Sequence, residues 1–158
     1  MKAISFAISL LMLAAGAASA GEASGNGALA LAALVAPHSP HLKASEKELL
    51  AKYLESESQA PFPAGEKFVV KVEDVICRIS DVDITSRGCE LNFGPKKVEL
   101  KGLEAQALYS TLVEIGVPAD GAAGTIYESV KNLDCAINPK EVKDGGGAGA
   151  KCKFSGGP

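Results

Sequence analysis

Four cysteines are the residues whose number and spacing most clearly indicate a chemistry, namely oxidation to disulfides. They are Cys77, Cys89, Cys135 and Cys152, and all follow an N-terminal segment with the features of a secretory signal. An even number of cysteines in an exported chain favours a disulfide framework. Neither neighbouring pair has the spacing of a zinc knuckle, roughly two to four residues, and no histidine lies near them in the sequence.

Four cysteines permit three pairings, and the expected strands favour one of them. Each neighbouring pair lies on the two arms of a predicted hairpin, where a Cα separation of about 5.5 Å would suit a disulfide. We therefore expect Cys77 to bond to Cys89 and Cys135 to bond to Cys152. Each bond would close a short loop and contribute roughly 3 kcal/mol in the loop-entropy model, so reduction should destabilise the protein.

Two other segments could hold a metal ion, but each has a simpler interpretation. The only histidines, His38 and His41, lie close together but have no assigned third ligand, and we interpret them as part of a solvated lead-in. Asp81–Thr85 begins like a calcium loop, yet Ser86 stands where that loop needs glycine and Asn92 where it needs the closing glutamate. We interpret it as a polar hairpin tip and predict no metal site.

The sequence contains no catalytic constellation. The stretch Gly145–Lys151 resembles a phosphate loop only superficially, because Cys152 follows the lysine where that loop has Ser or Thr. A serine or cysteine nucleophile lacks an obvious histidine base, and the carboxylates are too scattered to identify an acid and a base. We therefore predict that the protein is not an enzyme and uses no cofactor.

Residues 1–20 are predicted to be a cleavable secretory signal. They carry one charge at Lys2, an apolar run over Ile4–Ala15 and small residues before the expected cut. No cysteine follows that cut, so we expect a soluble periplasmic or secreted product beginning near Gly21, without membrane insertion. A second apolar run, Ala28–Ala36, is far shorter than the roughly 20 residues of a transmembrane helix, and we interpret it as a short packing helix.

The charge balance argues against some classes of partner. Loss of Lys2 would change the net charge from −3 to −4, and the only arginines are Arg78 and Arg87. A nucleic-acid partner would need a basic face, usually with arginines or aromatic residues along it. Neither feature is present, so we predict no nucleic-acid binding.

One α+β domain is expected over residues 43–155, after a flexible lead-in over 21–42 and before a tail over 156–158. Small residues and prolines in the lead-in favour flexibility. The capping box formed by Ser45 and Glu48 should begin the first helix of the domain. The expected elements are helices at about Ser45–Glu57 and Leu103–Ile115 and strands over Lys67–Ser80, Cys89–Phe93, Lys97–Lys101, Thr125–Pro139 and Lys151–Phe154.

Two parts of the chain share a pattern that predicts an internal duplication. Val72-x-x-Val75-x-Cys77 recurs 58 positions later as Val130-x-x-Leu133-x-Cys135. In both copies the apolar alternation changes parity, which predicts bulges near Glu73-Asp74 and Lys131-Asn132. We expect two units, at about 43–94 and 103–155, each a helix followed by a disulfide-closed hairpin.

These elements predict an antiparallel sheet covered on one face by helices. The layout resembles that of the secreted β-lactamase inhibitor proteins, in which two helix-plus-sheet repeats each carry a disulfide. The resemblance is one of architecture and implies no target and no contact residue for this chain.

We expect the function to be recognition of another protein, with inhibition as one form of it. Disulfide-closed hairpins suit this role, because ordering the loops in advance lowers the entropy cost of binding. The expected contact segments are the hairpin tip Asp81–Gly88, with Arg87 as its polar anchor, and the Pro-flanked residue Phe62. The alternatives are a structural or stress-related envelope protein and a carrier of a small apolar ligand.

Overall fold

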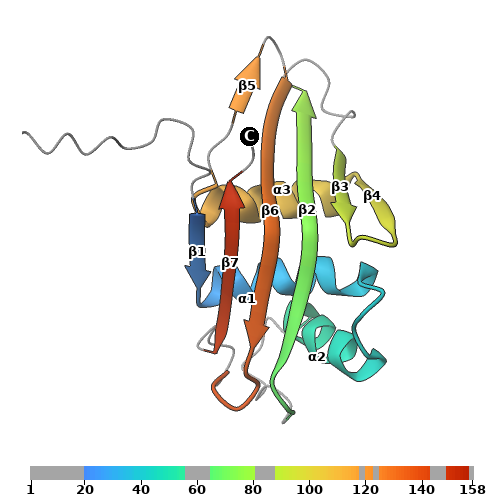
Figure 1. Cartoon of the computed structure of the whole chain (residues 1–158), viewed down its shortest axis with the longest axis vertical. Coiled ribbons are helices and arrows are strands. Elements are labelled where there is room, and N and C mark those ends of the chain that lie inside the picture. The colour runs from blue at the N-terminus through green and yellow to red at the C-terminus, as the bar shows by residue number, and fades with distance from the viewer. Residues whose placement is uncertain are drawn as a thin grey trace, which may run out of the picture.

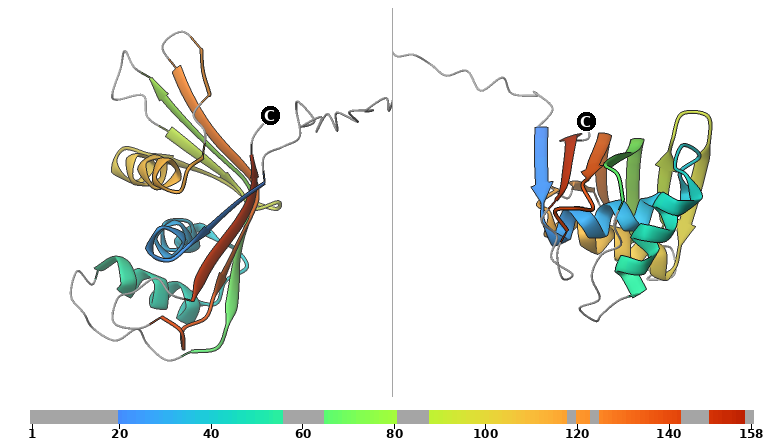
Figure 2. Two further views of the ribbon diagram at one scale, coloured as in Figure 1. Left: turned by 90° about the vertical axis from the view of Figure 1, so that its left-hand side faces the viewer. Right: turned by 90° about the horizontal axis from the view of Figure 1, so that it is seen from below.

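The computed structural model describes residues 20–55, 65–80, 88–117, 120–122, 125–142 and 149–156. In these ranges the chain forms a seven-stranded antiparallel sheet with three α-helices on one face (Figures 1 and 2). The predicted α+β class and one-sided helical cover are therefore confirmed. The elements are β1 (Ala20–Ser24), α1 (Asn26–Val35), the 3-10 turn η1 (Ala36–His38), α2 (Ala44–Glu55), β2 (Phe68–Ser80), β3 (Gly88–Asn92), β4 (Lys97–Lys101), α3 (Leu103–Glu114), β5 (Asp120–Ala122), β6 (Thr125–Ile137) and β7 (Ala150–Gly156).

Two long strands, β2 and β6, form the centre of the sheet. The strand order is β1-β7-β6-β2-β3-β4, and the short β5 pairs with β6. β2 and β6 pair from Phe68 opposite Ile137 to Ser80 opposite Thr125. Core-facing side chains such as Val70 are buried, and the alternate residues are exposed on the other face. The sheet curves around the helices, so its uncovered face is convex (Figure 2).

In both central strands, the alternation of buried and exposed residues changes parity where the sequence predicts bulges. On β2, Val72 and Val75 are both buried although two residues separate them. On β6, Asn132 has a φ of 52°, and the pairing of β6 with β7 shifts register between Lys131 and Asp134. The change of parity is confirmed on both strands and the bulge is confirmed on β6, and each strand thereby keeps an apolar face toward the core on both sides of the change.

The expected flexible lead-in over 21–42 is wrong. Its first residues form β1, which pairs with β7, and α1 follows in the middle of the core, with Leu29, Leu31 and Val35 fully buried. The predicted packing helix in the run 28–36 is confirmed by α1. Small side chains suggested flexibility, but alanines let this helix approach the sheet and the other helices closely.

The ends and faces of the other two helices differ in detail from the expectation. α2 begins at Ala44, and Glu46 Oε1 accepts a hydrogen bond of 2.9 Å from the Lys43 N–H, so this cap lies two residues before the predicted box. On α3, Leu103 is 88% exposed. As the first helical residue after Gly102, it precedes the buried stripe that begins at Ala105.

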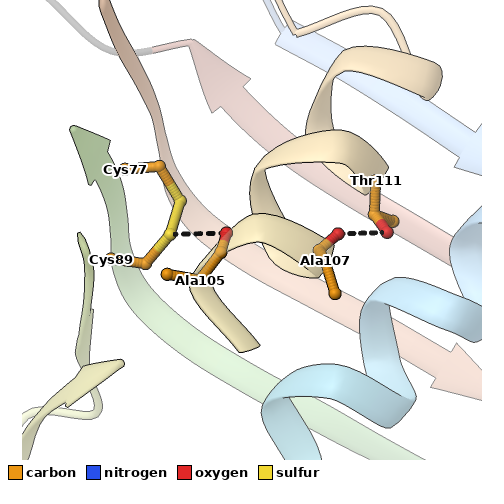
Figure 3. The surroundings of a disulfide bond; sticks show 5 residues. All are labelled: Cys77, Cys89, Ala105, Ala107 and Thr111. Carbon is orange, nitrogen blue, oxygen red and sulfur yellow. Dashed lines mark hydrogen bonds between the residues drawn. A yellow bond between two sulfur atoms is a disulfide. The ribbon is translucent and has the colours of Figure 1, made fainter. Parts of the chain in front are cut away.

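Both predicted disulfides are present, and each joins residues directly opposite each other in a hairpin. Cys77 bonds to Cys89 between β2 and β3, and Cys135 bonds to Cys152 between β6 and β7. The Cys89 sulfur lies 3.4 Å from the backbone oxygen of Ala105, in the first turn of α3 (Figure 3). An oxidised sulfur carries no hydrogen, so this is a packing contact rather than a donated hydrogen bond.

The second disulfide has a matching environment under a different helix. The Cys152 sulfur lies 3.4 Å from the backbone oxygen of Ala28, in the first turn of α1. α1 packs on β7 and β1, whereas α3 packs on β3 and β4. Both helices follow a five-residue strand and a glycine of positive φ, Gly25 or Gly102. α1, and not the predicted α2, is therefore the positional counterpart of α3, while duplication of the sequence itself stays a prediction.

Candidate functional site

The contact residues expected from the sequence lie outside the described residues. This applies to Phe62 and to Arg87 with the rest of the tip from Asp81. The predicted recognition loops therefore stay predictions. Gly88, the last residue of the expected tip, begins β3.

The two histidines do not share a partner. His38 Nε2 lies 3.6 Å from Glu104 Oε2 on α3, and His41 Nε2 lies 3.4 Å from the backbone oxygen of Phe93. Among the described residues, no three His, Cys, Asp or Glu side chains gather as metal ligands. The histidines instead connect the segment between α1 and α2 to other parts of the fold.

The convex face of the sheet carries charges of alternating sign. Lys71, Asp134, Lys153 and Glu22 lie opposite one another, in that order, on β2, β6, β7 and β1. Lys151 Nζ lies 2.8 Å from Glu22 Oε1. This hydrogen bond, together with the charges of Lys151 and Lys153, lowers the pKa of the Glu22 carboxyl. Such a face favours solvation and charged partners over an apolar ligand.

The central strand β2 is longer than its neighbour β3, which leaves part of one edge open. β3 ends at Asn92, opposite Asp74, so no described strand lies beside Phe68–Glu73 on that side. Asn92 Nδ2 donates to Asp74 Oδ2 at 3.3 Å, and Asn92 Oδ1 accepts from the Gly94 N–H at 3.0 Å. Asn92 thus ends the ladder and starts the turn to β4.

The disulfide next to this edge indicates where the backbone groups of β2 point. The Cα atoms of Cys77 and Cys89 are 4.0 Å apart, which is closer to a non-hydrogen-bonded antiparallel pair, at about 4.5 Å, than to a bonded one, at about 5.5 Å. Core-facing residues of β2 therefore direct their N–H and C=O groups toward β6. In a strand of L-residues, the face on which a side chain lies determines the edge to which the N–H and C=O of that residue point. Val69 and Lys71 face outward, so their N–H and C=O groups point to the open edge.

Two hollows follow this edge. The first, of about 360 Å³, lies between α2 and the beginning of β2. The second, of about 340 Å³, lies beside the bulge. The lining of the first includes Leu49, Lys52, Glu66 and Phe68, and that of the second includes His41, Lys71, Glu73, Phe93 and Asn132.

On β6, the part of the strand that extends beyond its neighbour β7 is paired with another strand, unlike the part of β2 that extends beyond β3 in the described residues. β5 pairs antiparallel with Thr125–Tyr127, just beyond the point where β7 ends (Figure 1). This half of the fold therefore shows that an added strand can extend the sheet at this position. In the half that contains β2, the described residues place no strand there.

Sequence reasoning missed this site, although one signal was available. The strand predicted over Lys67–Ser80 was much longer than its expected partner over Cys89–Phe93. Two strands of unequal length that meet at a short turn must leave part of the longer one unpaired on that side. The length mismatch therefore pointed to an open edge.

Comparison with known proteins found no matching family model, curated protein or solved structure. Among the described residues, no helix is long and apolar enough to cross a membrane.

Proposed function

We propose that this chain is an exported recognition module that binds another protein along the open edge of β2. The observation that carries the proposal is this edge, with its two adjoining hollows, in a sheet fixed by two disulfides. An edge whose conformation is fixed before binding lowers the conformational entropy lost on binding. Inhibition would follow if the bound segment belonged to the working surface of an enzyme.

Export by a cleaved signal is part of this proposal. A cut after Ala20 would make Gly21 the first residue of the mature chain, and Gly21 lies opposite Phe154 in β1. The mature chain would then begin within a paired strand. The two disulfides support an oxidising destination such as the periplasm or the extracellular space.

A carrier of a small apolar ligand has less support. Both hollows along β2 are lined by several charged residues, and each opens to solvent. Ligand sites for apolar molecules are lined mainly by hydrophobic and aromatic residues.

The test starts with immobilised, oxidised residues 21–158 and an extract of envelope and culture medium from the source organism. Captured proteins are identified by mass spectrometry, and each is purified and titrated against the chain by calorimetry. We expect one protein to bind in a simple stoichiometric ratio and to bind much less to the reduced, alkylated chain. If no purified candidate binds in solution, the recognition function is wrong.

A further inference from the structure

We propose that the partner binds by strand addition: an extended segment of it pairs antiparallel with β2 at Val69 and Lys71. This inference rests on the recognition function proposed above and specifies how the partner is held. Main-chain hydrogen bonds would supply affinity and alternate side chains would supply specificity, as in other complexes formed at sheet edges.

The backbone of β2 supplies the hydrogen-bonding groups. Val69 and Lys71 each direct one N–H and one C=O to the open edge, whereas core-facing Val70 directs its groups to β6, where it lies opposite Cys135. Val69 is 41% exposed on the convex face, and no described strand lies beside it at this edge. A partner strand can therefore pair here without breaking the ladder between β2 and β6.

The charge row on the convex face indicates one residue of the partner. Reading from β1 to β2, Glu22, Lys153, Asp134 and Lys71 alternate in sign across four adjacent strands. A strand added beside β2 would place its outward residue opposite Lys71. Opposite charges at directly facing positions stabilise a strand pair, so this residue should be Asp or Glu.

Strand geometry also places the partner residues that neighbour the acidic one. In an added strand, the residues on either side of the acidic one face the helices. There they lie near the first hollow, whose lining combines Leu49 and Phe68 with charged residues such as Lys52 and Glu66. The recognised segment is therefore defined by its acidic residue opposite Lys71, with the flanking residues on the helix side of the sheet.

The outer edge of β4 is a poorer site for the same partner. Lys97, Glu99 and Lys101 are exposed, and by the same coupling of face and direction they point their backbone groups outward. Charged residues along an edge oppose pairing with another strand. β4 also has only five residues, and the two hollows described above lie beside β2 instead.

A displayed library of random ten-residue peptides, panned on the oxidised chain 21–158, tests the mode of binding. We expect selected peptides to share an acidic residue. Peptides selected on the Lys71→Glu variant should carry Lys or Arg in place of the acidic residue. The side chain at position 71 would then be negative, and a positive residue opposite it would stabilise the strand pair. Panning on Lys97→Glu, a control on the edge of β4, should leave the selected pattern unchanged.

Backbone pairing is tested with a selected synthetic peptide. Lys71→Pro removes one edge-directed N–H, a change that edge strands tolerate, and should weaken binding at least about tenfold. Glu99→Pro makes the matched change on the edge of β4 and should leave the affinity unchanged. Because Lys71→Pro could disturb folding, amide exchange of the wild-type complex provides a second measurement: the Val69 and Lys71 amides should become protected by the peptide.

Two results would overturn strand addition: an unchanged peptide pattern on Lys71→Glu, or peptide binding that leaves the exchange of Val69 and Lys71 unaltered. These results can be told apart from failure of the recognition function. A purified partner that binds the chain with equal affinity in Lys71→Pro and wild type keeps the recognition function but removes this mode of binding.

Discussion

At the residue scale, Asn132 shows how one backbone angle shapes the sheet. Its φ of 52° lies in the left-handed region, which Asn and Gly tolerate far better than β-branched residues. We expect Asn132→Val to destabilise the fold by about 1–2 kcal/mol. Asn132→Gly should be nearly neutral. Urea unfolding of both variants checks this, and equal stability of the two would show that the positive φ is not needed.

The Glu22–Lys151 pair gives a prediction of pH dependence. The pKa of Glu22 is lowered in the folded state by its hydrogen bond with Lys151, so the pair stabilises the fold above the unfolded pKa of about 4.5. That contribution is lost as the pH falls through the folded pKa. We expect Lys151→Met to raise the pKa of Glu22, measured by NMR titration in low salt.

High salt is the control for this pair, because screening should reduce the difference between wild type and variant. A Glu22 pKa that is the same in both proteins would show that the ion pair does not form in solution. Both side chains are about half exposed, so the effect on stability should be small.

At the element scale, the two sulfurs of each disulfide have different surroundings. The sulfur of Cys89 lies against the Ala105 backbone oxygen, which a serine hydroxyl at that position could reach as a donor. Replacing the bond with Cys77→Ala and Cys89→Ser should cost roughly 3 kcal/mol for the lost cross-link. The reverse pair, Cys77→Ser with Cys89→Ala, should cost about 1 kcal/mol more.

The second disulfide offers a replicate of this experiment. Cys152 lies against the Ala28 backbone oxygen in the same way, so Ser at position 152 should be better tolerated than Ser at position 135. The comparison uses chemical unfolding of all four double variants. If serine is equally costly at both positions of each pair, the helix carbonyl does not act as an acceptor.

Most elements could be predicted because their signals are local. Alternation and cysteine spacing located the long strands, both disulfides and the change of parity in β2 and β6. β1 and the place of α1 in the middle of the core were missed because they depend on partners far along the chain: β1 needs β7, and α1 needs the apolar face of the sheet. No local pattern encodes those contacts, since propensity yields to tertiary packing.

At the scale of the whole molecule, β1 and α1 should be essential. We expect residues 43–158 to lose cooperative unfolding, because the chain would lack fully buried Leu29, Leu31 and Val35 as well as the strand beside β7. Leu31→Ala in the mature chain should cost about 2–5 kcal/mol. Calorimetry and chemical denaturation measure both effects.

Leu103→Ala is the matched control for Leu31→Ala, because the same truncation is made on a side chain that is exposed. It should change stability by no more than about 0.5 kcal/mol. A truncated chain 43–158 that unfolds as cooperatively as residues 21–158 would restore the interpretation of a flexible lead-in.

The candidate site was harder to predict than the fold. Its groups are backbone N–H and C=O atoms, which every residue carries, and their availability depends on where β3 ends and on the hollows beside α2. Side-chain types therefore directed the sequence analysis to Arg87 and Phe62, which the described residues do not include. Only the sheet register reveals which backbone groups of β2 face an open edge.

Amide hydrogen exchange on the free, oxidised chain 21–158 tests the central claim most directly. If β2 has an open edge, the Val69 and Lys71 amides should exchange at least about a hundredfold faster than those of Val70 and Val72, which pair with β6. Equal, strong protection of all four amides would show that the chain itself closes this edge, and would contradict binding of a partner there.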